Sequence, residues 1–296
     1  MNGREKGFLL LTSHMGDPQR KVLTVAQFRV LAQAVSGSEI PQSQGEVGEA
    51  ELMALGFNRA SAQRILHLLS EKERLELYLQ EGMQADCLAL TRVSPGYPLR
   101  LRQQLGLDSP GCLWVKGDPT ILSMPAVSVV GSRELGRSNR EFAQEAGRQA
   151  ALQGYALISG NARGADTEAQ EACLANGGKV ISVVADRLTD HALRENVLYI
   201  SEDGYDLDFS SQRALSRNRV IHALGDAALV AQSTLGKGGT WDGTCRNLKN
   251  GWSPVFCWDD GSEAVAQLTQ MGANTVTVED MQDLSRLKAE KTLFDQ

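Results

Sequence analysis

The chain has 296 residues, of which 42% are hydrophobic and 22% charged, and its formal net charge is −6. This length exceeds one typical domain and suits two, with enough residues to bury a sizeable core. The negative net charge excludes a basic field over the whole molecule, so any surface that binds DNA must be local.

Cysteine and histidine usage indicates neither disulfides nor a metal site. The five cysteines are odd in number and widely spaced, without a Cys-x-x-Cys pair, and the four histidines are scattered. Reduced thiols are typical of a cytoplasm. The apolar run 8–11 is too short for a signal-peptide core, and no segment is long enough to span a membrane. We therefore expect a cytoplasmic protein without membrane contact, metal or cofactor.

The first part of the chain carries helix patterns. Thr24 and Gln27 form a capping box, and residues 25–32 then place apolar side chains on one face. A glycine-containing turn follows a second short helix, and Asn58 can cap the helix after it. Such a pair occurs in DNA-binding proteins, but more often in a small bundle. We expect a small all-helical domain over residues 1–105.

Proline and glycine punctuate residues 94–119, and the hydrophobic period changes after them. Short apolar runs then alternate with helix patterns, and we predict strands at 126–130, 156–158, 180–184, 227–231, 255–257 and 275–278. This alternation predicts an α/β domain with a Rossmann-like, mostly parallel sheet and helices on both faces. We place this domain at residues 106–296.

The first two of these strands are joined by a predicted helix. Ser138 and Glu141 have the spacing of a capping box, and Phe142, Ala146 and Ala150 recur at helical spacing after it. The segment from the first strand to the turn after the second is therefore a predicted βαβ unit.

Both strands of this unit lead into a glycine-containing turn with an arginine. Glycines let the backbone turn sharply where parallel strands end, so that N–H groups face a crevice that attracts anions. An arginine fork grips phosphate well. Either turn alone fits an ordinary surface turn with a solvated arginine, but two at adjacent strand ends favour a phosphate site. The candidate residues are Gly131, Ser132, Arg133, Ser159, Gly160, Arg163 and Gly164.

Two further clusters are predicted at the same edge of the sheet. Arg217, Asn218 and Arg219 lie on a helix that buries Val220 and its apolar neighbours, although a salt-bridged surface helix would have the same pattern. A glycine-rich turn follows the strand at 227–231 and lacks the spacing of a Walker A loop. Its candidate ligand-binding residues are Lys237, Gly239 and Thr240.

Several ordered motifs resemble the DNA-processing protein A (DprA/Smf) family across most of the chain. They are Gly131-Ser132-Arg133, the segment 159–166 (Ser-Gly-Asn-Ala-Arg-Gly-Ala-Asp), Asn196, and Arg217-Asn218-Arg219-Val220-Ile221. The resemblance implies a Rossmann-like domain that binds single-stranded DNA in a basic pocket, preceded by a small helical domain. It also implies a protein of DNA processing, recombination or uptake that often forms a homodimer and helps to load a recombinase on DNA.

The chain departs from the family pattern at several positions. The family commonly has leucine at Asn161 and histidine at Gln170, and it usually carries Glu and a Ser-Gly-Ser turn in place of Gln232 and residues 236–240. The sequence also ends soon after Leu287, so we expect no C-terminal winged helix. These differences indicate a divergent branch.

Two alternatives use the same pocket. The related lysine-decarboxylase-like (LOG) phosphoribohydrolases carry a Gly-Gly-x-Gly-Thr turn followed by acids, which residues 239–242 resemble. Gly243 stands where their second, catalytic acid would be. Hydrolysis of a nucleotide therefore ranks second, and a sensor that binds a free nucleotide without cleaving it is the third possibility. We expect no catalytic residue.

Overall fold

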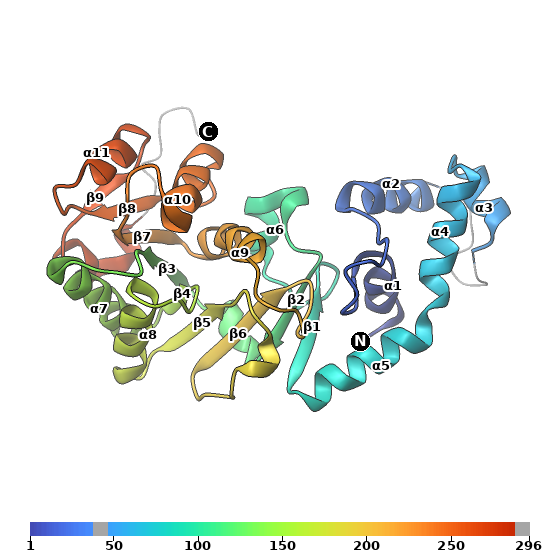
Figure 1. The fold of residues 1–296 in the computed structure, drawn as a ribbon, viewed down its shortest axis with the longest axis horizontal. Helices are drawn as coiled ribbons and strands as arrows, with labels where there is room; N and C mark the ends of the chain where they lie inside the picture. The colour runs from blue at the N-terminus through green and yellow to red at the C-terminus, as the bar shows by residue number, and fades with distance from the viewer. Residues whose placement is uncertain (38–46, 288–296) are drawn as a thin grey trace. The chain divides into compact units, whose positions relative to one another are not determined.

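The computed structural model describes residues 1–37 and 47–287, and the chain divides into two compact units (Figure 1). The first unit comprises Met1–Tyr97 with the short segments Pro110–Trp114 and Glu202–Tyr205. The second comprises Pro98–Ser109, Val115–Ser201 and the residues from Asp206 onward.

The first unit is mainly helical, as its sequence predicted. Thr24 Oγ1 accepts the main-chain N–H of Gln27, whose side chain accepts the N–H of Thr24, and this confirms the capping box. Asn58 caps a later helix by accepting the N–H of Ser61. The elements are α1 (Gly3–Thr12), α2 (Val25–Ser36), α3 (Glu49–Ala54), α4 (Arg59–Ser70), α5 (Lys72–Gln84) and the strand β1 (Cys87–Thr91).

The second unit contains a parallel sheet. Its strands are β3 (Ala126–Gly131), β4 (Ala156–Ser159), β5 (Lys179–Val183), β6 (Val197–Glu202), β7 (Ala227–Gln232), β8 (Val255–Trp258) and β9 (Asn274–Val276). They lie in the order β6-β5-β4-β3-β7-β8-β9, and each neighbouring pair is parallel. The strand order reverses between β3 and β7, which is where open α/β sheets form a ligand crevice.

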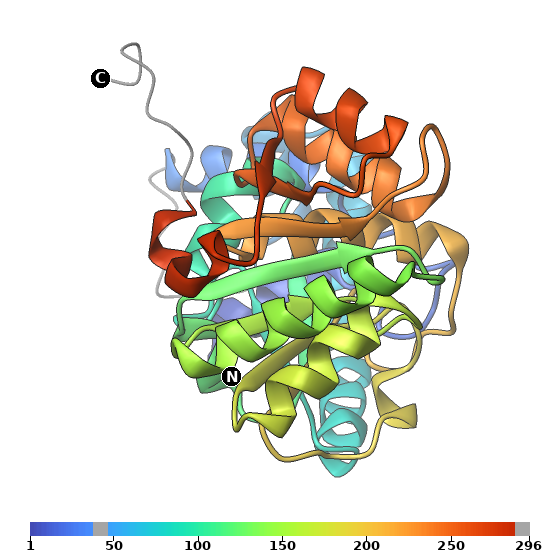
Figure 2. The same cartoon turned by 90° about the vertical axis from the view of Figure 1, so that its left-hand side faces the viewer.

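Helices cover both faces of this sheet. They are α7 (Arg137–Leu152), α8 (Ala165–Ala175), α9 (Ser211–Leu224), α10 (Gly238–Asn250) and α11 (Glu263–Gln270). The helix α6 (Leu99–Leu105) packs against α9, and the strand β2 (Cys112–Lys116) precedes β3 in the chain. Val127 and Val129 of β3 pack in one core with Phe142 of α7. Ser128, which points the other way, donates a 2.6 Å hydrogen bond to the carbonyl of Ile221 on α9. The predicted Rossmann-like architecture is thus confirmed (Figure 2).

One predicted helix start is wrong. The helix α7 begins at Arg137 with Gly136 as its N-cap, so Ser138 lies inside the first turn and forms no capping box. The N–H of Gly136 donates a 2.9 Å hydrogen bond to Oε1 of Gln232, the last residue of β7. A contact with a distant strand end therefore sets the entry into this helix.

The described residues form no helix that is both long and apolar enough to cross a membrane. All five cysteines are free thiols. Burial raises the pKa of Cys173 to about 12, so this thiol stays protonated at neutral pH.

Candidate nucleic-acid interface

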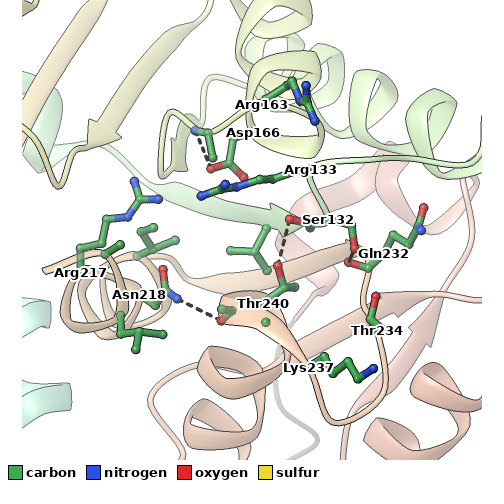
Figure 3. Close-up of a pocket in the computed structure, with 18 of the residues that line it drawn as sticks. Ser132, Arg133, Arg163, Asp166, Arg217, Asn218, Gln232, Thr234, Lys237 and Thr240 are labelled. Atoms are coloured by element: carbon green, nitrogen blue, oxygen red, sulfur yellow. Dashed lines mark hydrogen bonds between the residues drawn. The ribbon is translucent and has the colours of Figure 1, made fainter. Parts of the chain in front are cut away.

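A cavity of about 850 Å³ lies at the point where the strand order reverses. The turns after β3, β4 and β7 form its walls, together with α9 and the start of α10 (Figure 3). The predicted residues that line it are Gly131, Ser132, Arg133, Arg163, Arg217, Asn218, Lys237, Gly239 and Thr240. Three clusters that are far apart in the sequence therefore meet at one site.

The lining of the cavity is locally basic although the whole chain is acidic. Its cations are Arg133, Arg163, Arg217 and Lys237, and its carboxylates are Glu134 and Asp166. Four positive against two negative side chains leave a surplus of two positive charges, in a chain of net charge −6. This cavity is therefore a local basic surface, which an acidic chain needs if it is to bind DNA.

Gly164 allows the turns after β3 and β4 to pack backbone against backbone. Its φ is +90°, and a Cβ atom there would collide with the carbonyl oxygens of Ser132 and Arg133. The N–H of Ala165 donates a 3.2 Å hydrogen bond to the carbonyl of Ser132. The glycine thus permits the conformation of the turn, and it does not itself line the cavity.

The carboxylate of Asp166 stabilises the turn after β4. Its buried carboxylate accepts the N–H groups of Gly160 at 2.9 Å and Ala162 at 3.1 Å. Burial raises the pKa of Asp166, while Arg217 and the two N–H donors oppose this rise. Since the carboxylate is engaged with the backbone, its main role is to fix the turn.

Arg217 braces the same turn from α9. Its guanidinium donates hydrogen bonds to the main-chain carbonyls of Gly160 and of Val183, the latter at 2.6 Å. Burial lowers the pKa of Arg217, and the charge of Asp166 offsets part of this effect. Arg217 therefore forms part of the cavity wall and is only partly available to a ligand.

The two arginines of the turns lie differently. Arg133 extends across the cavity beside Asp166, where its charge also opposes the rise in the pKa of that carboxyl, and it forms no ion pair within the described part of the chain (Figure 3). Arg163 points away from the centre of the cavity and pairs with Glu134 at 3.5 Å. Both partners of that pair are largely exposed, so the pair contributes little to stability. Arg133 is the cation best placed to meet a phosphate.

The glycine-rich turn after β7 is held by polar side chains. Thr240 Oγ1 donates a 2.9 Å hydrogen bond to the carbonyl of Gly131, and Asn218 Nδ2 donates a 3.0 Å hydrogen bond to that of Gly239. Lys237 is exposed on the same turn. The donors of Thr240 and Asn218 thus position the turn, and Lys237 remains the exposed cation.

Four predicted residues do not line this cavity. The side chain of Ser159 is fully buried and accepts a hydrogen bond from Gln170. Gly160 lines a smaller neighbouring pocket together with Arg133 and Arg163, and Gly164 packs as described above. Arg219 follows Arg217 by two positions, or roughly 200° around the helix, so its side chain leaves on another face.

The cavity also contains residues that were not predicted, among them Phe209, His222 and Gln232. His222 lies four positions after Asn218 on α9, and this helical spacing would have revealed it. Phe209 lies in the segment before α9, where the sequence carries no periodic signal. Its side chain is exposed beside the cavity.

A family model, that of the DNA recombination-mediator protein A, matches residues 89–286. The chain belongs to this family. DNA processing protein DprA of Streptococcus pneumoniae is 30% identical over 190 residues, which are 57% of this chain and 64% of that protein. Protein Smf of Escherichia coli is 27% identical over 249 residues, or 79% of this chain and 65% of that protein. The match thus spans less than two thirds of either relative.

Solved structures share the fold. DprA from Streptococcus pneumoniae superposes with a TM-score of 0.73 at 22% identity, covering 98% of this chain and 100% of that one. DNA processing protein A from Helicobacter pylori gives a TM-score of 0.56 at 23% identity, covering 67% of this chain and 95% of that one.

Proposed function

We propose that this protein takes part in DNA processing by binding single-stranded DNA in the cavity. The observation that carries the proposal is the position of Arg133, which lies across a locally basic cavity without an ion-pair partner in the described residues. A guanidinium in this position can make charge-assisted hydrogen bonds to phosphate. The family supports this ligand, since the structure of its Helicobacter pylori member concerns a single-stranded DNA binding mode.

A single strand suits the cavity better than a duplex. Phe209 and Leu215 line the cavity with exposed fractions of 57% and 45%, so they offer an apolar surface against which unpaired bases can stack. A duplex hides its base faces and needs a broad basic surface, whereas the cations here are few and local. Recombinase loading and homodimer formation, which the resemblance implies, stay predictions.

Hydrolysis of a nucleotide is not favoured by the local packing. A Cβ atom at Gly243 would lie 3.2 Å from the Cβ atom of Asn218 and 3.2 Å from Nε2 of His222. An acidic side chain at this position would therefore press against α9. This close approach of α10 to α9 supports binding as the function of the cavity.

Direct binding measurements test the proposal. Fluorescence anisotropy would follow a labelled single strand of roughly ten nucleotides, with unlabelled single strand, duplex and mononucleotides as competitors. We expect the single strand to compete best and binding to weaken with salt, at a log–log slope of roughly −1 to −2 for two or three phosphates. Equal or stronger competition by the duplex or by a mononucleotide would contradict the proposal.

A further inference from the structure

His222 is a buried titratable residue that phosphate binding does not use. It lies on α9 one turn after Asn218, and it lines the cavity while only 1% of its surface is exposed. The cations of the cavity come mainly from the turns. A histidine in the lining therefore adds a polar group of a different kind.

The orientation of Asn247 next to this histidine is fixed by the backbone. The main-chain N–H of Ser253 donates a 2.9 Å hydrogen bond to Asn247 Oδ1. The amide nitrogen of Asn247 must then face the opposite side, where it lies 3.1 Å from His222 Nδ1 and 3.1 Å from Ser253 Oγ. Because an amide NH₂ group only donates, His222 Nδ1 has to be the acceptor.

This contact determines which nitrogen of His222 carries the proton. A ring whose Nδ1 accepts a hydrogen bond has its hydrogen on Nε2 when it is neutral. Burial lowers the pKa of His222 to about 4, so the ring is neutral at physiological pH. His222 therefore presents a fixed N–H donor on the edge opposite Asn247.

The Nε2 donor of His222 has no hydrogen-bond partner in the described part of the chain. Its neighbour on α10 is Gly243, where a Cβ atom would lie 3.2 Å from Nε2. Only a glycine at this position lets α10 pack so closely against the ring. A donor of the cavity lining without a partner in the protein favours an acceptor supplied by a ligand.

We propose that Nε2–H of His222 donates a hydrogen bond to a nucleobase acceptor, a ring nitrogen or a carbonyl oxygen, of the bound strand, and that Asn247 is its positioning residue. This inference rests on the proposed binding of single strands. A base fits better than a phosphate because the donor is neutral, and because Ala214, Leu215 and Ile221 of α9 add apolar lining beside its polar residues. Every base offers an acceptor, so the contact recognises a base without selecting a sequence.

The first test compares a thymidylate strand with an abasic strand of the same length. The wild type should bind thymidylate more tightly, and His222→Phe should reduce the ratio of the two affinities by about three- to tenfold, as expected for one neutral hydrogen bond. His67→Phe, at an exposed histidine of α4, is the control and should keep the wild-type ratio. An unchanged ratio in His222→Phe would contradict the base contact alone, whereas a wild type that binds neither strand would contradict the proposed function.

A second test needs no variant and therefore does not depend on whether His222→Phe folds. Ring nitrogen shifts of the protein labelled with ¹⁵N-histidine should show the Nε2–H form for His222, whose resonance is the one that stays neutral down to about pH 4. The Nε2–H form is also expected for His191, whose Nε2 lies 2.9 Å from Asp186 Oδ1. Adding thymidylate should move the Nε2–H resonance of His222, while an abasic strand or inorganic phosphate should leave it in place. A proton on Nδ1, or an equal shift with the abasic strand or with phosphate, would overturn the inference.

Discussion

The guanidinium of Arg217 on α9 donates a hydrogen bond to the main-chain carbonyl of Gly160, in the turn that follows β4. The same guanidinium donates to the carbonyl of Val183, the last residue of β5, so one side chain connects α9 to two strand ends. The shape of the cavity therefore depends on an arginine that the sequence suggested as a ligand-binding residue.

Replacing Arg217 by alanine should destabilise the fold. The change removes hydrogen bonds from a charged donor and leaves the buried carboxylate of Asp166 with less compensation, at a cost of about 2–4 kcal/mol. Chemical denaturation measures this cost. Arg163→Ala is the matched control, and because this side chain is 75% exposed its free energy of unfolding should stay within about 0.5 kcal/mol of wild type. Equal stabilities of the two variants would refute the bracing role.

Gly164 should tolerate alanine much less well than Gly154. Both have positive φ, +90° and +72°, which alanine rarely adopts, so alanine strains the backbone at either position. Only at Gly164 would the new Cβ atom also collide with the carbonyls of Ser132 and Arg133, whereas Gly154 has open space. Thermal unfolding should show a clearly larger loss for Gly164→Ala, and equal losses would show that the close approach is unimportant.

The stability of the protein should fall as the pH drops from about 6.5 to about 4. The pKa of His222 is lowered from 6.5 to about 4 in the folded state. The unfolded chain therefore takes up a proton in this window while the folded chain does not, at a cost of roughly 3 kcal/mol. Urea unfolding of wild type and His222→Phe at several pH values checks this, since the variant should lose part of the dependence. Parallel curves for the two proteins would contradict it.

Much of the fold could be predicted because the sequence signals for strands and turns are local. Glycines after short apolar runs correctly marked the ends of β3, β4 and β7. The strand β6 was not predicted, since no α-helix separates it from β5 and the alternation of strands with helices is interrupted there. The start of α7 was misplaced because Gln232, distant in sequence, holds Gly136.

The sequence predicted those site residues whose place in the cavity follows from residue type and position in the chain alone. The sequence placed Arg217 correctly beside the cavity, yet its bonds to main-chain carbonyls follow from tertiary packing. Ser159 belongs to a promising motif, but Gln170 on α8 binds its hydroxyl. The helical spacing from Asn218 could have placed His222 in the lining, but which of its ring nitrogens carries the proton follows only from the contact with Asn247.

Glu134 should weaken phosphate binding by holding Arg163. The two side chains form an exposed ion pair at 3.5 Å, and the carboxylate also repels a phosphate. Glu134→Gln should therefore raise the affinity for a single strand a few-fold at low salt, and the gain should be smaller when Arg163 is also changed to alanine, because only the direct repulsion is then relieved. Anisotropy titrations of the single and double variants measure this coupling. Unchanged affinity in Glu134→Gln would mean that Arg163 does not reach the strand.

The affinity of Arg133→Ala for a labelled single strand tests the central claim most directly. Arg137→Ala is its control, because Arg137 is a 93% exposed arginine of α7 that does not line the cavity. We predict that Arg133→Ala binds about ten- to a hundredfold more weakly than wild type at unchanged melting temperature, with only partial recovery in Arg133→Lys. Arg137→Ala should bind like wild type. An Arg133→Ala protein that melts normally and binds the strand as tightly as Arg137→Ala would contradict the cavity as the binding site.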